Sequence, residues 1–454
     1  MSPLGVVLPA TLAQLEHGPL ICDGVDALAH RVLTYTKVGE YYNGKHPMNY
    51  VSSAFRERFQ GALQHLADNL CPLVVDTISG RLIVDGFDPA GDAAKLFLTA
   101  SRFDAKQRQI HRDAVLHGDA YAILWETDQG PRLYRQRPWQ IIPVYDDSDS
   151  ERMIAAVKVW QVGTKNERRT RVTVYYDNRV ERYITKNKAD ALSNLAKATL
   201  IPFDADGEAA KQTHSFSRVP VFHWANGAGP GEFGRSELQP VIPLQDLLNK
   251  SLYDLVVGME ASAYPQRYAT GIEQSINPET GKPDQAWVAQ KLWVSGNPDA
   301  NFGQLPGGEF QGNLAVAEST RMEVARVSSV PAYFFGQKGE VPSGAALRVT
   351  ESPLQTKVED RQVTFGNVWE DIVATATGQE VNSVWRDTSP VTELERAELG
   401  AVLDRLGVPK AMVFQLALSI DAAQAQELAA QAEQAALQRE ERAFARLTRA
   451  PEVP

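Results

Sequence analysis

The first half of the chain combines helical and strand patterns of apolar residues. Apolar residues at helical spacing predict helices over about residues 11–38, with an interruption at Gly18-Pro19, and over about 50–70 and 103–116, the last ended by Gly118. β-Branched and aromatic runs between polar turns predict strands over residues 121–125, 141–145, 154–160, 171–176 and 219–224. Residues 190–207 are expected to form a surface excursion. This half therefore predicts a mixed α+β body.

The second half is dominated by helical patterns. Two patterns, 241–259 and about 313–329, enclose a Pro/Gly-rich insert of strand and turn character. The longest pattern runs from Ser343 to Gly378, and Pro353 inside it is expected to kink the helix because proline lacks an N–H. Beyond residue 391 only helices are predicted, with Thr392-Glu-Leu-Glu395 as a capping box. Residues 421–448 are rich in Ala, Gln, Glu and Arg and have little apolar surface.

Composition excludes several classes of protein. The length of 454 residues predicts two to four substructures, and the apolar fraction of 43% is ordinary for a folded chain. No apolar run is long enough for a membrane span, and the first residues lack the basic segment of a secretory signal. The two cysteines, Cys22 and Cys71, fit neither a disulfide framework nor a zinc site. The net charge of −10 argues against a broad DNA-gripping surface, but not against a wall past which DNA slides.

The strongest candidate for enzyme chemistry is Gly229-Pro-Gly-Glu-Phe-Gly-Arg-Ser236. It fits the spacing of a phosphate-binding loop, with Arg235 in place of the usual lysine. Pro230 removes one backbone N–H that such a loop needs, and Arg235 is not a compact point charge. A glycine-bearing connection into the helix that follows explains the same residues.

The other candidate sites can also be explained without a catalytic or metal-binding role. His111-Arg-Asp113 and His117-Gly-Asp119 match fragments of a kinase loop and a metal pair, but no supporting residues occur at the required spacings. No G-x-S-x-G elbow is present, and the basic run Arg168, Arg169 and Arg171 is interpreted as a solvated hairpin turn. No catalytic, metal or cofactor site is predicted.

The order of the segments resembles that of tailed-bacteriophage portal proteins, in particular those of actinobacterial phages. The segments that carry the resemblance are 41–44, 69–76, 81–87, 117–125, the approach Gly234-Arg-Ser-Glu-Leu238 with the helix after it, 331–335, 342–347, 351–365 and 406–409. Portal proteins form the ring through which DNA enters and leaves a capsid, so the resemblance implies a protein that is not an enzyme and needs no cofactor.

The resemblance also implies an architecture. It is an α+β fold with a mixed wing body (1–237, continued by a kinked helix and return strand at 345–390), stem helices 238–264 and 312–330, a small α/β clip 265–311, a tunnel loop 331–344 and an all-helical crown 391–454. About twelve copies would form the ring. The stem pattern supports this, because its apolar stripe is expected to need cover from adjacent subunits; the stripe comprises Leu244, Leu248, Leu252, Leu255 and Met259.

Sites and partners follow from the resemblance in the same way. The tunnel loop is expected to line the DNA channel through Phe335, Gln337, Lys338, Glu340 and Ser343. The clip is expected to present a docking surface that contains Tyr268, Trp287, Trp293 and Phe302. The implied partners are double-stranded DNA, the terminase large subunit, a head-completion adaptor, the major capsid protein and a scaffolding protein, with no membrane. The protein is expected at the portal vertex of the virion, and in the host cytoplasm during assembly.

Two other functions compete with this interpretation. A nucleotide-hydrolysing packaging motor would use the Gly229–Ser236 loop. A head-completion adaptor would also be a ring component, but adaptors are far shorter and lack an insert between two stem helices.

Overall fold

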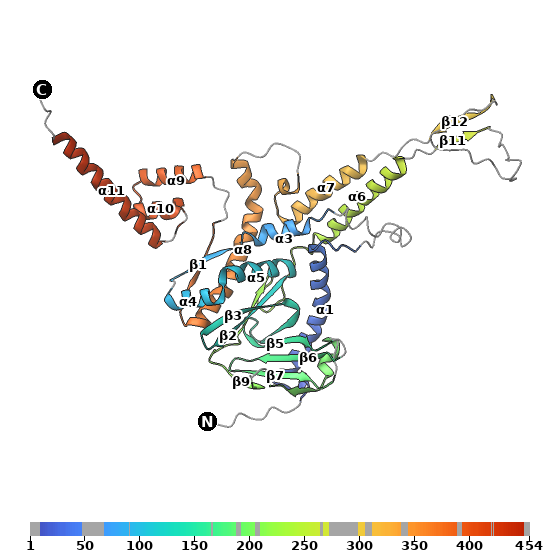
Figure 1. Cartoon of the computed structure of the whole chain (residues 1–454), viewed down its shortest axis with the longest axis horizontal. Coiled ribbons are helices and arrows are strands. Elements are labelled where there is room, and N and C mark those ends of the chain that lie inside the picture. The colour runs from blue at the N-terminus through green and yellow to red at the C-terminus, as the bar shows by residue number, and fades with distance from the viewer. Residues whose placement is uncertain are drawn as a thin grey trace.

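The computed structural model describes residues 10–47, 68–89, 91–164, 167–187, 192–204, 209–263, 267–271, 298–304, 311–336, 344–387, 393–418, 420 and 422–448. An α/β body carries a helical hairpin that projects to one side and a separate group of helices on the other (Figure 1). The hairpin consists of α6 and α7 and ends at strands β11 and β12, and the separate group consists of α9, α10 and α11.

Helices and short 3₁₀ turns make up much of the described chain. The α-helices are α1 Gly18–Tyr42, α3 Cys71–Ser79, α4 Asp92–Ser101, α5 Phe103–His117, α6 Ile242–Ala263, α7 Gln311–Ser328, α8 Gly344–Thr377, α9 Glu393–Arg405, α10 Lys410–Leu418 and α11 Ala422–Thr448. The 3₁₀ turns are η1 Leu12–Gln14, η2 Pro138–Gln140, η3 Leu192–Lys197 and η4 Ala332–Phe335.

The strands form two larger antiparallel sheets and two isolated pairs. The three-stranded sheet has the order β10 (Val221–Ala225), β2 (Asp119–Thr127), β3 (Gly130–Gln136). The six-stranded sheet has the order β4 (Ile141–Tyr145), β5 (Met153–Val162), β6 (Arg169–Tyr175), β7 (Arg179–Thr185), β8 (Leu200–Pro202), with β9 (Lys211–Thr213) also paired to β7. The pairs are β1 (Val84–Asp88) with β13 (Asn382–Trp385), and β11 (Arg267–Thr270) with β12 (Asn301–Gln304).

Three apolar clusters hold the body together. The largest joins α3, α5, one face of β2 and β3, and the inner faces of α6, α7 and α8. A second lies between α1 and the six-stranded sheet, and a third lies between the two large sheets. Because strand side chains alternate between faces, β2 supplies Ala122 and Leu124 to the first cluster and Tyr121 and Ile123 to the third.

Several predicted elements are confirmed with shifted ends. Gly18 and Pro19 begin α1 and do not interrupt a helix, in keeping with the preference for proline in the first helical turn. Helix α5 ends at Gly118, which has a φ of 92°. A Cβ atom on Gly118 would lie 2.6 Å from the Gly234 carbonyl oxygen, so glycine is required there for packing as well as for conformation. The helix predicted over about 50–70 falls outside the described residues, except for residues 68–70.

Other expectations need correction. Strands β3 and β7 and helix α4 are not predicted from the pattern. Strand β3 and helix α4 are partly exposed, and β7 buries the charged residues Glu181 and Arg182. The excursion predicted at 190–207 is not confined to the surface: Leu195 and Leu200 are buried in the second cluster, and β8 pairs with β7. The basic run is only partly a turn, since Arg169 and Arg171 belong to β6.

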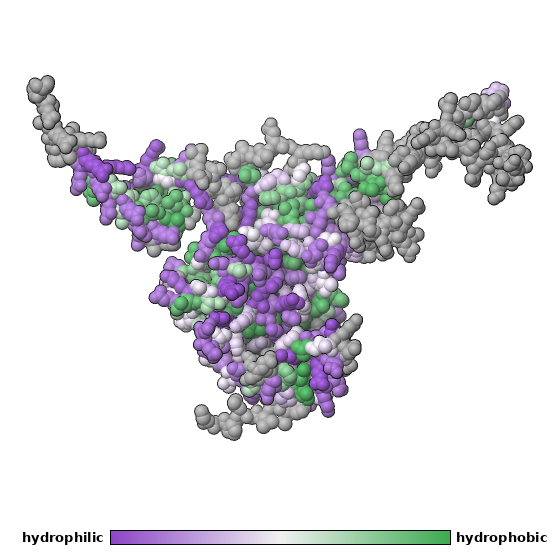
Figure 2. All heavy atoms as spheres, viewed as in Figure 1, coloured by the Kyte–Doolittle hydropathy of each residue, from purple (hydrophilic) through white to green (hydrophobic). Residues whose placement is uncertain are grey.

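The C-terminal half follows the predicted order of helices. Helix α8 continues across Pro353, so the kink expected there stays a prediction. Strand β13 then returns to pair with β1, residues almost three hundred positions earlier in the chain. Helices α9 to α11 expose many apolar side chains, visible as green surface on the separate group in Figure 2. None of the helices in the described parts of the chain is both long and apolar enough to span a membrane.

Candidate functional site

The projecting hairpin is fixed to the body by buried polar contacts at the start of α6. Gln245 is fully buried, and its Oε1 accepts a hydrogen bond from the Leu70 N–H at 2.9 Å, at the beginning of α3. The Tyr41 hydroxyl at the end of α1 donates to both oxygens of Asp246, at 2.8 and 2.9 Å. On the opposite helix, Arg321 of α7 pairs with Asp68 at 2.8 Å. The hairpin therefore leaves the body in a direction set by α1, α3 and the segment before α3.

The predicted stem stripe is largely covered within one chain. Leu248 is fully buried, and Leu244 and Leu252 pack against the main cluster. Leu255 is half-buried, and Met259, nearest the distal end, is 55% exposed. The expectation that the stripe needs a neighbouring subunit is wrong for its first half, because α7 and the body cover it. The apolar side chains that do face solvent on α6 and α7 are Leu247, Val256, Met259, Leu314 and Val316.

The distal end of the hairpin contains part of the predicted clip. Strands β11 and β12 pair so that Tyr268 lies opposite Gly303 and Phe302 lies opposite Ala269. The Phe302 side chain is 39% exposed. Trp287 and Trp293 lie outside the described residues. The structure therefore places two of the four predicted docking residues on one small β-ribbon.

The predicted tunnel loop begins at η4 and ends at the start of α8. Phe335 is 5% exposed and belongs to the main cluster, so its prediction as a channel-lining residue is wrong: the 3₁₀ turn directs this ring inward. Gly336 follows with a φ of 79°. Gln337, Lys338, Glu340 and Ser343 lie outside the described residues.

The two ends of this loop are tied together by a charged contact that the sequence analysis missed. The Tyr333 hydroxyl in η4 donates to Glu351 of α8, and Arg81 Nη2, after α3, donates to the other Glu351 oxygen at 2.9 Å. Desolvation and the hydrogen bond to Glu351 raise the pKa of Tyr333 to about 12, so the phenol stays a donor at neutral pH. The base of the loop is thus held in place.

A second network joins the end of α7 to α8 and to the entry of α6. Lys357 Nζ lies 2.9 Å from Glu237 Oε2 and 2.9 Å from the Ser328 carbonyl oxygen. Arg361 donates to Glu237 Oε1 at 3.1 Å and to Asn226 Oδ1 at 2.7 Å. Burial opposes ionisation of Glu237, but Lys357, Asn226 and Arg361 outweigh it and lower the pKa of this carboxyl. The loop base, both hairpin helices and α8 are therefore coupled through one ionised carboxylate.

The centre of the body is organised by a third carboxylate, Asp119, at the start of β2. Its side chain is completely buried. It accepts hydrogen bonds from the Tyr35 hydroxyl at 2.7 Å and the Gly234 N–H at 2.7 Å, and it pairs with His223 at 2.9 Å and with Arg31. Burial opposes ionisation, yet His223, Arg31 and Tyr35 together lower the pKa of Asp119. Helix α1, strands β2 and β10 and the segment entering α6 thus meet at one charge.

This contact gives His117-Gly-Asp119 and the Gly229–Ser236 loop structural roles. The N–H of Gly234 donates to Asp119, that of Arg235 to the Asn226 carbonyl at 2.8 Å, and the Ser236 hydroxyl to the Leu116 carbonyl at 2.5 Å. A phosphate-binding loop needs such donors free for its ligand. Among the described residues, no group of three or more His, Cys, Asp or Glu side chains is arranged to hold a metal ion.

His111 and Asp113 are likewise part of the core. His111 is fully buried between the Leu82 carbonyl, 2.8 Å from Nδ1, and the Trp369 indole, which donates to Nε2 at 2.8 Å. Asp113 pairs with Arg135 of β3. Asp119, Glu237 and Glu351 carry no local sequence signal, because their partners come from distant segments.

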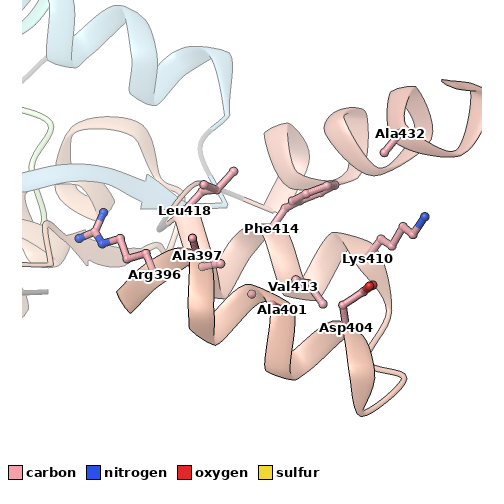
Figure 3. A pocket seen from close by; sticks show the side chains of 11 residues that line it. Arg396, Ala397, Ala401, Asp404, Lys410, Val413, Phe414, Leu418 and Ala432 are labelled. Carbon is pink, nitrogen blue, oxygen red and sulfur yellow. The ribbon is translucent and has the colours of Figure 1, made fainter. Parts of the chain in front are cut away.

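The separate helical group contains an apolar pocket of about 720 Å³ between α9, α10 and α11 (Figure 3). Ala397, Ala401, Val413, Phe414 and Leu418 line its interior, and Arg396, Asp404 and Lys410 lie at its rim. Gly400 allows the close approach of α9 and α10, since a Cβ there would lie 3.3 Å from the Ala417 Cβ. The three helices enclose this pocket only in part.

Together, the fold and the site define a structural protein with an α/β body, a projecting helical hairpin, an anchored loop at the hairpin base and a helical module at the C-terminal end. The family model described as phage portal protein, SPP1 Gp6-like, matches residues 25–438. The chain belongs to this family of portal proteins. The portal prediction is thereby confirmed, and the alternative of a packaging motor is not supported.

The chain is also similar to two portal proteins and, more distantly, to chains in solved structures. The portal protein of Mycobacterium phage L5 is 25% identical over 391 residues, which cover 80% of this chain and 77% of that protein. That of Mycobacterium phage D29 is 24% identical over the same length and coverage. A chain in the virion of a native gene transfer agent particle has 13% identity and a TM-score of 0.47, covering 80% of this chain and 94% of that one. A chain in the neck of the empty particle has 14% identity and a TM-score of 0.48, covering 77% and 90%.

Proposed function

We propose that this protein forms a ring of about twelve subunits at one capsid vertex, and that genome DNA is packaged and ejected through its channel. The observation that carries the proposal is the α6–α7 hairpin, whose two helices both expose apolar side chains outside the body. Exposed apolar surface of this kind favours contact with another chain. Within the portal family, a second copy of the same chain is the partner that fits such a repeated contact.

The first prediction is that the purified protein assembles into closed rings. Mass photometry should show a particle of about twelve times the 50.0 kDa chain, and negative-stain images should show a hollow ring. Val256→Glu is expected to prevent assembly, because it places a charge on the exposed apolar face of α6. Leu96→Glu, at a 72% exposed position on α4, is the matched control and should assemble normally. A wild-type protein that stays monomeric at high concentration in several salts contradicts the proposal.

The loop between η4 and α8 is assigned to the channel in this proposal. Its support is the fixed base formed by Tyr333, Glu351 and Arg81, which would present residues 337–343 at one place in every subunit. Lys338 would contribute a ring of positive charge, with Glu340 partly offsetting it. Coulomb attraction between a lysine and a phosphate is about 1 kcal/mol at 4 Å in water, so each contact can break during DNA movement.

The second prediction concerns Lys338. Lys338→Glu is expected to slow packaging or weaken genome retention while rings still assemble, because a negative ring would repel DNA at the constriction. Packaged DNA per particle is the measurement, and Lys338→Arg, which keeps the charge, is the control. Equal packaging and retention in both variants would remove Lys338 from the channel.

The hairpin tip, which carries Tyr268 and Phe302, is assigned to docking of the terminase large subunit and later of a head-completion adaptor. The body would face the capsid and scaffolding proteins. Binding of the terminase to rings that lack residues 270–300 tests the first assignment, and unchanged binding would contradict it.

A further inference from the structure

A narrow cleft opens between the two large sheets of the body. The two sheets pack against each other through the third apolar cluster. Next to this cluster, the space between the sheets forms a cleft with a volume of about 260 Å³. Residues of β2 and β3 form one wall, and residues of β5, β6 and β7 form the other. Figure 1 shows where these strands lie in the body. Aromatic and basic side chains dominate the lining; the aromatic ones are Trp125, Tyr134, Trp160 and Tyr175, and the basic ones are Lys158, Arg171 and Arg182. None of the residues that line the cleft belongs to the α6–α7 hairpin or to the tunnel loop.

Two of the three cations that line this cleft share one aromatic ring. Lys158 of β5 and Arg171 of β6 lie 4.8 and 4.9 Å from the centre of the Trp160 ring. Phe203 is a second aromatic contact of the Arg171 guanidinium, at 4.5 Å. Neither cation forms an ion pair with a carboxylate of the described residues. Burial and the neighbouring Arg171 lower the pKa of Lys158, and an added anion would favour its charged form by offsetting the repulsion from Arg171.

An exposed acidic hairpin lies at the other end of the same sheet. It connects β4 to β5 and contains Asp146, Asp147, Asp149 and Glu151, with Arg152 as its only cation. Asp147, Asp149 and Glu151 are exposed. The hairpin is held against the body at Gly231, where a Cβ would lie 2.7 Å from the Ser150 carbonyl oxygen. The acidic side chains are therefore presented to solvent from a supported turn.

The hairpin cannot reach the cleft of its own chain. Strand β5 begins directly after the hairpin, and Lys158 lies about 20 Å further along it at the usual rise of a strand. A repeated head-to-tail contact in a ring uses two different surfaces of each subunit. The acidic hairpin and the basic cleft are such a pair, with opposite charge and fixed positions on one sheet.

We propose that the acidic β4–β5 hairpin of one subunit docks into the basic, aromatic cleft of the next subunit in the ring. This inference rests on the proposed ring. The occupant is a second copy of this chain, because the chain itself supplies the complementary charge. Nucleic acid is disfavoured, since a cleft of about 260 Å³ admits a few side chains and the whole chain carries a net charge of −10.

A charge-reversal cycle on the ring tests this contact. Lys158→Glu, and separately Asp147→Lys with Asp149→Lys, should each weaken assembly by about 10- to 100-fold in the protein concentration required, because like charges would meet. Combining all three substitutions in one chain should restore assembly in part, since the carboxylate introduced at position 158 would then face the lysines introduced at positions 147 and 149. Mass photometry over a concentration series measures all of these, and circular dichroism of each variant verifies folding. The exposed Lys95 on α4 supplies the matched control, Lys95→Glu, which should assemble as the wild type does.

Each possible result of the charge-reversal experiment either supports or contradicts a stated part of the proposal. If the wild type forms no ring, the proposed ring fails before the contact is tested. If the wild type forms rings and the single reversals do too, the hairpin-to-cleft contact is overturned while the ring stands. If the cleft variant fails but the combined variant is not rescued, the cleft has another occupant and the inference is also overturned. Rescue by the combined variant alone supports it.

Discussion

Replacing Asp119 with alanine is expected to lower the free energy of unfolding by about 3–5 kcal/mol, because it removes a completely buried carboxylate and leaves the partly buried Arg31 without its counter-ion. The same substitution removes the acceptor of the Tyr35 hydroxyl and of the Gly234 N–H. Helix α1 and the segment entering α6 would keep the hydrogen bond from Arg31 to the Gly234 carbonyl oxygen, but they would lose the contacts that both make with Asp119. Urea unfolding followed by circular dichroism measures the change.

Asparagine separates charge from shape at this position. Asp119→Asn keeps one oxygen acceptor but presents no charge to Arg31, so its loss should be smaller, about 1–3 kcal/mol. Asp128, exposed in the turn between β2 and β3, provides the matched control: Asp128→Ala is expected to change stability by less than about 0.5 kcal/mol. Equal stability of Asp119→Ala and Asp128→Ala would show that the buried network does not hold the body together.

The second large effect is a loss of stability in mild acid caused by two buried histidines. Burial lowers the pKa of His111 to about 4, and burial together with the nearby Arg135 lowers that of His117 to about 4. Both stay neutral in the folded chain above that pH, whereas the unfolded chain takes up protons on each below about 6.5. The free energy of unfolding should therefore fall as the pH drops from about 6.5 toward 4, by about 2 kcal/mol per histidine at pH 5.

The contacts of His111 explain why its pKa is low. Nε2 already accepts a hydrogen bond from Trp369, so a second proton on the ring would have to displace that bond inside the core. His111→Gln should reduce the dependence of unfolding on pH, and His30→Gln, an exposed position on α1, is the control. Urea midpoints at pH 7.5 and 5 provide the comparison. A pH dependence in His111→Gln as steep as that of the wild type would contradict the assignment.

The elements that could be predicted from the sequence are those whose own pattern is strong. Helix α5 has apolar residues at helical spacing and a glycine at its end, and strands β2 and β5 have β-branched and aromatic runs. Strand β7 escaped prediction because its charged residues Glu181 and Arg182 are buried. Arg179 and Tyr183 of the same strand donate to Glu181, and Arg182 donates to the Ala209 carbonyl oxygen in a loop. A local pattern reports burial on average and cannot register burial that distant polar partners make possible.

The candidate site, too, could be predicted only in part from the sequence. Segment order by itself indicated a portal protein, a hairpin of two helices and a loop before α8, because these depend on propensity, turn residues and the order of segments. Phe335 could not be placed correctly, since a ring beside a glycine-bearing loop fits either a channel or a core. Only the three-dimensional packing decided that it faces inward.

The sequence alone therefore determined the family, the order of the main segments and the approximate bounds of several long helices. The tertiary structure alone decided which charges act together: Asp119 with Arg31 and His223, Glu237 with Lys357 and Arg361, and Glu351 with Arg81. All of these contacts except Asp119 with Arg31, which spans 88 positions, join residues more than 100 positions apart. The order of residues along the chain does not reveal these contacts, because a buried carboxylate is stabilised only by the partners that folding brings to it.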